Sequence, residues 1–418
     1  MKYELKFGKD KVKFEIDDKN YMGEILPREI ESDITGEAEV ERALKNPIGT
    51  SRLKDIVKPG EKIVIVTSDI TRPMPSKKVL PPVLRELSLA NVSKKDITIV
   101  LALGSHRSHT EEEKRNLIGD EIYDSEIEII DSDMNKCINL GECTNGTPVD
   151  IFKPVAKADR IICMGNIEYH YFAGYSGGSK AIMPGVSSHD AIQANHSNMI
   201  KDEAYAGNLE TNPVRQDIDE TGEFVKIDFI INVVLNKKKE IVKAVAGHYI
   251  KAHREGCRHL DEMYGVEIEK QGDIVIVSPG GFPKDLNIYQ SQKGLDNSKH
   301  AVREGGIIIL AASAKEGFGE KTFEDWMLHK KPREMIKEIK ENFKLGGHKA
   351  AAIAMILQKA DIYMVTDLED ELVRKINFKP FNTVQGAIEA ALKELGEDSQ
   401  IMIMPAAGST LPRFNSSC

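Results

Sequence analysis

The sequence has few of the features that mark membrane, secreted or nucleic-acid-binding proteins. No apolar run in its 418 residues approaches the roughly 20 residues that span a bilayer. The first ten residues, MKYELKFGKD, are polar and contain no signal-peptide core. Lys and Arg total 57 against 66 Asp and Glu, so the net charge is 57 − 66 = −9, with both signs mixed along the chain. We therefore expect a cytoplasmic protein with neither nucleic acid nor membrane as a partner.

Cysteine is also scarce. The five cysteines are an odd number and include no C-x-x-C pair. Such a set favours neither a disulfide framework nor a thiolate zinc site. We expect structural thiols in a reducing compartment at Cys137, Cys143, Cys163, Cys257 and Cys418.

The remaining composition is that of a packed globular protein. Apolar residues make up 41% of the chain and charged residues 29%, which excludes a disordered or fibrous protein. At roughly 150 residues per domain, this length predicts two or three domains. No internal repeat or low-complexity tract interrupts the sequence.

The first half of the chain has the pattern of an α/β domain. Residues 3–7 and 12–16 alternate apolar and polar side chains, which predicts an N-terminal β-hairpin. Short continuous apolar runs then follow, as in buried parallel strands. The segment 76–91 has helical apolar spacing and links the first two runs into a βαβ unit. The runs are KIVIV (62–66), ITIVLAL (97–103), RIICM (160–164) and FIINVVL (229–235).

The second half repeats this pattern. Four further apolar runs, DIVIVS from 273, GIIILAAS from 306, DIYMVT from 361 and IMIMP from 401, alternate with helical patterns at 285–304, 348–360 and 384–395. The charged stretch 264–272 is the expected boundary. We predict two α/β domains, 1–268 and 269–418, with mostly parallel sheets flanked by helices. Ligands in such folds bind beyond the carboxyl ends of the strands, so we expect the active site in the interdomain cleft.

Polar residues directly follow the first predicted strand. In Ser68–Pro73, the sequence is SDITRP, and Pro73 is expected to start the next helix. Arg72 offers a fixed positive charge at the strand end, which suits a phosphate or a carboxylate. The alternative is a salt bridge between Arg72 and Asp69 at the helix entry.

The second strand is followed by GSHRSHT (104–110). Thr110 and Glu113 are spaced as a capping box, so a helix is expected to begin there. His106 precedes the cap in a loop, where it is either an acid/base group or a structural histidine. We expect His109, beside the cap, at the surface.

A long glycine-rich segment, Gly165–Gly185, follows the third strand. It is not a Walker A motif, because Ser179 and Ala181 stand where Gly and Ser or Thr are required. Its glycines allow backbone amides to approach an anion closely. Lys180 is either a nucleophile toward a carbonyl or acyl group or a counter-charge for phosphate. Its sequence neighbours are not apolar enough to lower its pKa, which disfavours a lysine-dependent aldolase.

Two more segments carry candidate binding groups. His196 lies near the end of a helical stretch from about Ser188, as a single metal ligand or a satisfied helix-end histidine. Any metal there requires most of its ligands from elsewhere. Gln290 and Lys293, three residues apart, share a helix face, where they present an amide and an ammonium to a ligand or to solvent.

Taken in order, five motifs resemble those of the nickel-dependent lactate racemase family, whose members racemise or epimerise 2-hydroxy acids. The resemblance covers nearly the whole chain. The motifs are DITRP (69–73), GSHRSHT (104–110), EYHYFAGYSGGSKAIMPG (168–185), QANHS (193–197) and YQSQKGLDN (289–297).

The resemblance implies a covalent cofactor, the nickel-pincer nucleotide Ni(II)-pyridinium-3,5-bisthiocarboxylate mononucleotide. Lys180 would be the attachment residue and His196 the protein's nickel ligand, with the organic group supplying the other ligands. Domain 1–268 would bind the cofactor and domain 269–418 would close over the substrate. Maturation would require cofactor-biosynthesis proteins. The residues implied to hold the nucleotide are Asp69, Ile70, Thr71 and Arg72.

The resemblance further implies an isomerase that interconverts D- and L-2-hydroxy acids. A hydride would pass to the nickel cofactor and a proton to a histidine, through a 2-keto acid. His106 and His170 would be the acid/base residues on opposite faces of the substrate. Lactate is the default substrate; malate or another 2-hydroxy acid, and a non-catalytic nucleotide- or metal-binding protein, are the alternatives. The substrate carboxylate would be bound by Gln290, Lys293, Arg72 and Tyr289.

Overall fold

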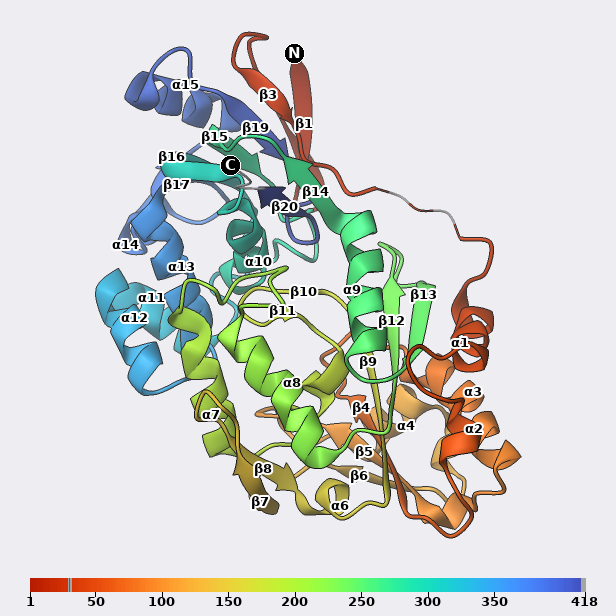
Figure 1. Cartoon of the computed structure of the whole chain (residues 1–418). Coiled ribbons are helices and arrows are strands. Elements are labelled where there is room, and N and C mark those ends of the chain that lie inside the picture. The colour runs from red at the N-terminus through yellow and green to blue at the C-terminus, as the bar shows by residue number, and fades with distance from the viewer. Residues whose placement is uncertain (29, 31, 415–418) are drawn as a thin grey trace. The chain divides into compact units, whose positions relative to one another are not determined.

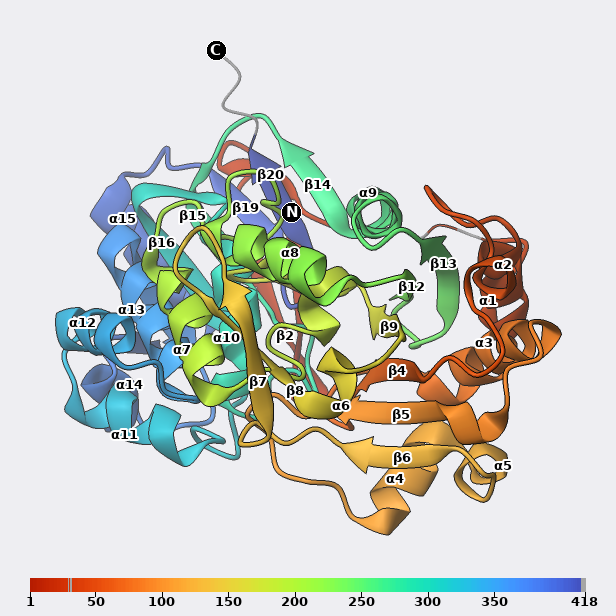
Figure 2. The ribbon, with the colours of Figure 1, turned by 60° about the horizontal axis from the view of Figure 1, so that its bottom comes forward.

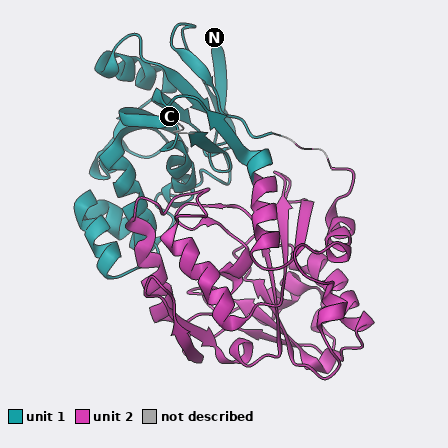
Figure 3. Ribbon diagram, viewed as in Figure 1, with its two compact units in different colours: residues 1–29, 261–418 teal, residues 30–260 magenta. Residues whose placement is uncertain are grey.

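The computed structural model describes residues 1–28, 30 and 32–414 (Figure 1). The chain forms two compact units, one of residues 1–29 with 261–418 and one of residues 30–260 (Figure 3). Each unit is built on a six-stranded sheet. No helix of the described residues is long and apolar enough to cross a membrane.

The sheet of unit 30–260 has the strand order β13-β12-β9-β4-β5-β6. Neighbouring strands are parallel, except that β12 and β13 are antiparallel. The four strands predicted in this half are β4, β5, β9 and β12, and all four are confirmed. The strands are β4 (Ile63–Ser68), β5 (Ile97–Ala102), β6 (Glu128–Asp131), β9 (Arg160–Asn166), β12 (Phe229–Leu235) and β13 (Ile241–Gly247).

Helices cover both faces of this sheet. Helices α1 and α3 lie side by side (Figures 1 and 2). Leu80 and Val83 of α3 pack with Ile65 and Ile99 in a core that also includes apolar residues of α1. On the other face, α8 contacts the 3₁₀ turn η2, which in turn contacts β4 and β9. The helices are α1 (Gly36–Lys45), α2 (Leu53–Ile56), α3 (Ser76–Leu89), α4 (Glu111–Ile118), α5 (Asp120–Tyr123), α6 (Lys153–Ala156), α7 (His189–Ser197), α8 (Pro213–Val225) and α9 (Lys251–Tyr264), with 3₁₀ turns η1 (Lys94–Asp96), η2 (Gly178–Ala181) and η3 (Asn198–Ile200).

Two small hairpins complete this unit. The strands β7 (Cys137–Glu142) and β8 (Pro148–Phe152) pair antiparallel, as do β10 (Tyr169–His170) and β11 (Gly174–Tyr175). The glycine-rich segment is therefore an ordered structure made of β10, β11 and η2. Of the predicted helix starts, Ser188 caps α7 as expected, whereas α3 begins at Ser76 and not at Pro73.

The sheet of the other unit is entirely parallel, with the order β18-β17-β16-β15-β19-β3. Its predicted strands and helices are present, although the helix expected over 285–304 is the shorter α10. The strands are β3 (Tyr21–Glu24), β15 (Gly272–Val277), β16 (Val302–Ala311), β17 (Ala360–Val365), β18 (Lys379–Phe381) and β19 (Ile401–Met404), and β14 (Gly265–Ile268) pairs with β20 (Leu411–Phe414). The helices are α10 (Ile288–Ser298), α11 (Lys321–His329), α12 (Pro332–Glu341), α13 (Gly347–Lys359), α14 (Asp370–Lys375) and α15 (Val384–Leu395).

The N-terminal hairpin belongs to this second unit. Strands β1 (Lys2–Phe7) and β2 (Asp10–Glu15) pair as predicted. Leu5 and Phe14 are buried in one core with Ile276, and β3 adds to the sheet beside β19. Burial of these apolar side chains therefore groups residues 1–29 with the C-terminal part of the chain, whereas the division predicted at residue 268 assigned them to the first domain.

The fold class expected from the sequence, mixed α/β with parallel-dominated sheets, flanking helices and an N-terminal hairpin, is confirmed. The cysteines Cys137, Cys143, Cys163 and Cys257 are free thiols. Cys418 lies outside the described residues.

Candidate active site

Three of the polar loops predicted from the sequence meet at one edge of the sheet in unit 30–260. They follow β4, β5 and β9, which are parallel neighbours, so their carboxyl ends lie on the same side. The Gly104 amide donates a hydrogen bond to the Gly185 carbonyl at 2.9 Å. The Ser132 hydroxyl, after β6, donates to the same carbonyl at 3.3 Å. The start of the His106 loop is thereby tied to the end of the glycine-rich segment.

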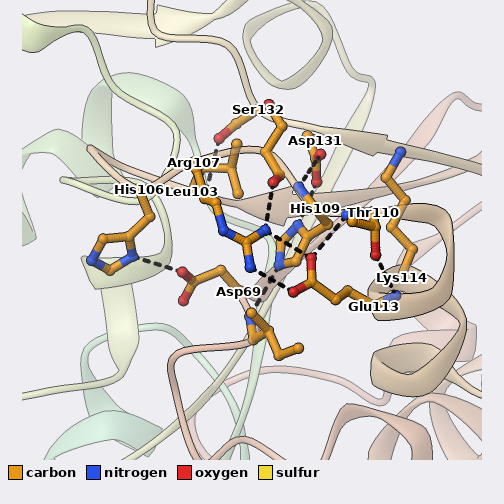
Figure 4. Close-up of polar contacts among 12 residues, drawn as sticks. Asp69, Leu103, His106, Arg107, His109, Thr110, Glu113, Lys114, Asp131 and Ser132 are labelled. Carbon is orange, nitrogen blue, oxygen red and sulfur yellow. Dashed lines mark hydrogen bonds and ion pairs between the residues drawn. The ribbon is translucent and has the colours of Figure 1, made fainter.

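The loops after β4 and β5 are joined by a carboxylate–histidine pair. Asp69 Oδ2 lies 2.6 Å from His106 Nδ1 (Figure 4). The Thr71 hydroxyl donates to both Asp69 oxygens, at 2.9 and 3.1 Å. Among the described residues, the ion-pair partner of Asp69 is therefore His106 and not Arg72, so the helix-entry salt bridge considered for Arg72 is not formed.

The Asp69 carboxylate is buried, at 2% exposure, yet it is held in its ionised form. Burial opposes its charge, but the hydrogen bonds from His106 and Thr71 outweigh burial and lower the pKa of Asp69 below its ordinary value. An ionised Asp69 accepts the Nδ1 proton of His106. This leaves the lone pair of His106 on Nε2, the atom that can exchange a proton with a ligand.

His109 is not a surface residue, and the expectation from its place beside the helix cap was wrong. Its side chain is 1% exposed. Its Nδ1 lies 2.6 Å from Asp131 Oδ1, at the end of β6, and its Nε2 accepts from the Ile70 amide at 3.1 Å (Figure 4). The histidine turns inward because two polar groups of the neighbouring loops satisfy both of its ring nitrogens.

The predicted capping box of α4 is present. The Thr110 hydroxyl accepts from the Glu113 amide, and Glu113 accepts from the Thr110 amide. Glu113 also pairs with Arg107, and this pair, together with the backbone bond, lowers the pKa of Glu113 to about 2. The loop that contains His106 therefore ends at the capped first turn of α4.

The glycine-rich segment is held by buried polar side chains. Gly177 and Gly178 have positive φ angles of +79° and +60°, and a Cβ at either position would lie within 3 Å of Asn232 or Arg215. Asn232 Oδ1 accepts from the Gly178 amide at 2.7 Å. The segment thus needs glycine both for its backbone conformation and for the close approach of its neighbours.

Two of these neighbours, Arg215 and His253, are fully buried. Arg215 donates to the carbonyls of Tyr175 and Gly177 and lies 2.9 Å from Asp219. His253 Nε2 donates to the Ser176 carbonyl at 2.8 Å. Burial, and then the charges of Arg215 and Arg254, lower the pKa of His253 well below its ordinary value, so it is a neutral donor.

Lys180 follows this turn, in η2. Its Nζ lies 3.4 Å from His170 Nε2. Burial, and then the charges of Arg72 and Arg215, lower the pKa of Lys180 well below its ordinary value. The sequence-based view that nothing around Lys180 would depress its pKa was wrong, because the burial comes from the fold and not from sequence neighbours. A lowered pKa increases the fraction of the lysine that is the neutral, nucleophilic amine.

His170 and His196 both contact the aromatic ring of Phe172. The Phe172 ring centroid is 4.5 Å from His170 and 5.0 Å from His196, edge-on in both contacts. His196 is buried on α7, and its Nδ1 lies 3.1 Å from Asn195 Oδ1. Because an amide oxygen can only accept, Nδ1 is the donor and the lone pair of the neutral ring lies on Nε2.

The residues predicted to bind the substrate carboxylate from the second domain lie on α10, in unit 1–29 and 261–418. Gln290 and Lys293 both lie on this helix, three residues apart as predicted, and both are exposed. The Tyr289 ring lies under Lys349, whose Nζ is 3.9 Å from the ring centroid. Arg72, the fourth of these residues, is exposed after β4 in the other unit.

Cys143, Asp217 and Glu220 have ligand atoms within 4.8 Å of one another. Their hydrogen bonds fit a structural role and not a metal site. Asp217 accepts from Asn145 and Thr147, and Glu220 accepts from Thr144, so the carboxylates fasten the β7–β8 turn to α8. Burial raises the pKa of the Cys143 thiol to about 11, which disfavours the thiolate that a metal requires.

The sequence analysis did not identify Arg215, His253 and Asp131. Arg215 could have been found, because it lies on the same helical stripe as Ile218 and Gly222, which face the core. His253 and Asp131 have no comparable local signal, since their partners are distant in sequence.

Comparisons with known proteins identify the family of the chain. Residues 7–207 match the lactate racemase N-terminal domain and residues 267–411 the lactate racemase C-terminal domain. A lactate racemase of Thermoanaerobacterium thermosaccharolyticum is 36% identical over 422 residues, covering 98% of this chain and 99% of that protein. A lactate racemase of Lactiplantibacillus plantarum is 33% identical over 415 residues, covering 96% and 97%.

Solved structures show the same relationship. The lactate racemase apoprotein from Thermoanaerobacterium thermosaccharolyticum matches with a TM-score of 0.88 at 35% identity, covering 99% of this chain and 100% of that one. A Thermotoga maritima protein matches with a TM-score of 0.64 at 18% identity, covering 93% and 100%, and shows a likeness of fold alone. Relatives this similar over nearly their full length, together with both domain matches, establish that the chain belongs to the lactate racemase family of isomerases.

Proposed function

We propose that this protein is a 2-hydroxy acid racemase, with lactate as its first expected substrate, that works with a nickel-pincer nucleotide attached to Lys180. The named relatives are lactate racemases, which supports the substrate class. The observation that carries the proposal is the arrangement around Lys180. Its amine, whose pKa lies well below the ordinary value, is 3.4 Å from His170 Nε2, and His170 and His196 both contact the ring of Phe172.

The residues present fit this cofactor. A neutral amine can be acylated, and the resulting amide or thioamide has no charge to bury, which suits the environment of Lys180. The tautomer of His196 directs a lone pair from Nε2, as a metal ligand requires. Gly177 and Gly178 bring the backbone close to its neighbours where a Cβ would clash. We assign Lys180 as the attachment residue and His196 as the nickel ligand.

The segment after β4 is assigned to the nucleotide. Asp69, Ile70, Thr71 and Arg72 follow the strand directly, and the charge of Arg72 helps to lower the pKa of Lys180. An exposed guanidinium at a strand end is well suited to a phosphate or a carboxylate. Arg72 therefore serves either the nucleotide or the substrate carboxylate.

When bound, the nickel-pincer nucleotide supplies an electron-poor centre that accepts and returns a hydride. The protein supplies the proton chemistry. His106 takes the hydroxyl proton at Nε2, and the ionised Asp69 at Nδ1 stabilises the imidazolium that forms. His170 would serve as the acid/base residue for the opposite enantiomer. Two histidines are required because the hydroxyl group of each enantiomer presents its proton differently.

The carboxylate of the substrate is assigned to α10. Gln290 and Lys293 offer an amide donor and an ammonium on one exposed helix face, and Tyr289 precedes them on the same helix. These groups would orient the hydroxy acid for reaction.

The experiment that tests this function is to purify the protein anaerobically after co-expression with cofactor-building enzymes. The mass of the peptide that contains Lys180 and the bound nickel are measured, together with the racemisation of L-lactate followed by chiral chromatography. We expect one nucleotide adduct on Lys180, about one nickel per chain and formation of D-lactate. An unmodified Lys180 in protein from this source would refute the proposal.

Matched variants sharpen this test. His196→Ala should lose nickel, whereas His189→Ala, an exposed histidine at the start of the same helix α7, should retain it. A panel of enantiomers, including lactate and malate, identifies the substrate. Borohydride treatment with a keto acid should leave no trapped adduct on Lys180, because a lysine-dependent aldolase alone would form one.

A further inference from the structure

A second histidine–carboxylate pair lies beside the first one. His106 and His109 are three residues apart in the loop after β5, and each ring meets a carboxylate at the end of a neighbouring strand (Figure 4). Asp69, which follows β4, partners His106, and Asp131, at the end of β6, partners His109. Of these two histidines, the resemblance to known racemases assigned a role only to His106.

The hydrogen bonds fix the protonation of His109. The Ile70 amide can only donate, so His109 Nε2, 3.1 Å away, must be unprotonated. The single ring proton is then on Nδ1 and is donated to Asp131 Oδ1 at 2.6 Å. The other oxygen of Asp131 accepts from the His109 amide at 3.0 Å. Asp131 thus holds the ring of His109 in one tautomer and one orientation.

The bond from Ile70 matters because of its place in the chain. Ile70 directly follows Asp69, and the Asp69 carboxylate is the partner of His106. The segment after β4 is therefore tied to the loop after β5 at two points, once by the Asp69 side chain and once by the Ile70 backbone. If the second tie is lost, the peptide that carries Asp69 is free to rotate away from His106.

We propose that His109 is a positioning residue, which holds the Ile70 amide and thereby keeps the Asp69 carboxylate aligned with His106 and the nucleotide-binding segment 69–72 in place. Asp131 acts through His109. The inference rests on the proposed function in that His106 is taken as an acid/base residue. Neither His109 nor Asp131 touches the reacting atoms.

Two substitutions separate this role from simple packing. A glutamine places its amide oxygen about where histidine has Nε2, so His109→Gln keeps the acceptor for Ile70. An asparagine is shorter and places its amide about where histidine has Nδ1, so His109→Asn keeps the bond to Asp131 but loses the acceptor. Both remove the ring from a buried position, so a merely structural role would make the shorter side chain only modestly worse.

The first measurement is hydrogen–deuterium exchange of the Ile70 amide in the apoprotein, which needs no cofactor. We expect exchange at least tenfold faster in His109→Asn than in the wild type, and near wild-type protection in His109→Gln. In the loaded enzyme, kcat for lactate should fall roughly tenfold to a hundredfold in His109→Asn with little change in KM, and His109→Gln should restore most of it. Thermal unfolding is recorded for each variant.

Asp131→Asn keeps the test valid if His109→Asn does not fold. It leaves His109 in place but removes the carboxylate that fixes its tautomer, so Ile70 exchange should rise and kcat should fall. Equal kcat in all variants, or losses that follow the unfolding midpoint and not the Ile70 amide, would overturn the inference. If the exchange pattern holds but the wild-type loaded enzyme does not racemise lactate, the proposed function fails and the positioning of the segment stands.

Discussion

The Asp69 carboxylate lies 2.6 Å from His106 Nδ1, and a third residue, Thr71, donates to both of its oxygens. The carboxylate is buried and ionised, while the histidine side chain is 27% exposed. A buried negative charge at Nδ1, on a ring that is partly exposed, lets a histidine take and return a proton repeatedly.

Removal of this charge should reduce turnover. In Asp69→Asn the amide cannot stabilise an imidazolium and can favour the wrong tautomer of His106, so we expect kcat to fall on the order of 100-fold or more with KM nearly unchanged. Steady-state kinetics of the loaded enzyme measures this. Asp190→Asn, an exposed carboxylate on α7, is the control and should leave kcat unchanged. Wild-type kcat in Asp69→Asn would show that the pair is not part of the proton chemistry.

The lowered pKa of Lys180 predicts how the stability of the apoprotein depends on pH. Lys180 is neutral in the folded chain over a range where it is charged in the unfolded chain, so the unfolded state binds more protons and stability rises with pH. This rise should run from the lowered pKa up to about pH 10.4, the ordinary value for lysine. Lys180→Met should therefore be more stable than the wild type at neutral pH, with the difference shrinking toward pH 10.

Thermal unfolding of the apoprotein between pH 6 and pH 10 checks this prediction. Lys201→Met, which replaces an exposed lysine, should follow the wild-type curve. If Lys180→Met is less stable than the wild type at neutral pH, the amine is charged in the folded chain and the cofactor attachment loses its physical basis.

Arg215 should contribute strongly to stability although it lies outside the reaction. It is fully buried, donates to the carbonyls of Tyr175 and Gly177 and pairs with Asp219, which also pairs with Arg254. In Arg215→Met the two carbonyls lose their donor, and we expect a loss of about 3 kcal/mol in the free energy of unfolding. Urea denaturation measures it. Arg258→Met, an exposed residue on α9, should change the free energy by less than about 0.5 kcal/mol.

Much of the fold could be predicted because its signals are local. The run FIINVVL is a strand from Phe229 to Leu235 in the structure, and the Thr110 capping box begins α4 as its spacing requires. The carboxyl ends of β4, β5 and β9 also bring their polar loops together, since parallel neighbours share one edge. What could not be predicted depends on partners distant in sequence. The strand β3 pairs with β19, nearly the whole chain away, and so draws the N-terminus into the second unit.

The site residues also divide into those with a local sequence signal and those whose partners are distant in sequence. Glycine and capping patterns mark the segments that contain His106 and Lys180, but the burial that lowers the pKa of Lys180 comes from the fold. His109 looks like a surface histidine next to a helix cap, and only the position of Asp131 at the end of β6 explains why it turns inward. A charged residue on an apolar helical stripe, as at Arg215, is the one signal of this kind that a sequence can show.

A substitution at Lys293 tests whether α10 binds the substrate carboxylate or only faces solvent. The side chain is exposed, so its replacement should cost the folded protein little, and we expect Lys293→Met to change the free energy of unfolding by less than about 0.5 kcal/mol. A charge-assisted hydrogen bond to a carboxylate is worth about 1.5 to 3 kcal/mol, so KM for lactate should rise roughly tenfold to a hundredfold. Lys321→Met, at the exposed start of α11, should leave KM unchanged. An unchanged KM in Lys293→Met would assign the lysine to solvent and require another residue to bind the carboxylate, because an anion held without a countercharge could not be oriented for proton and hydride removal.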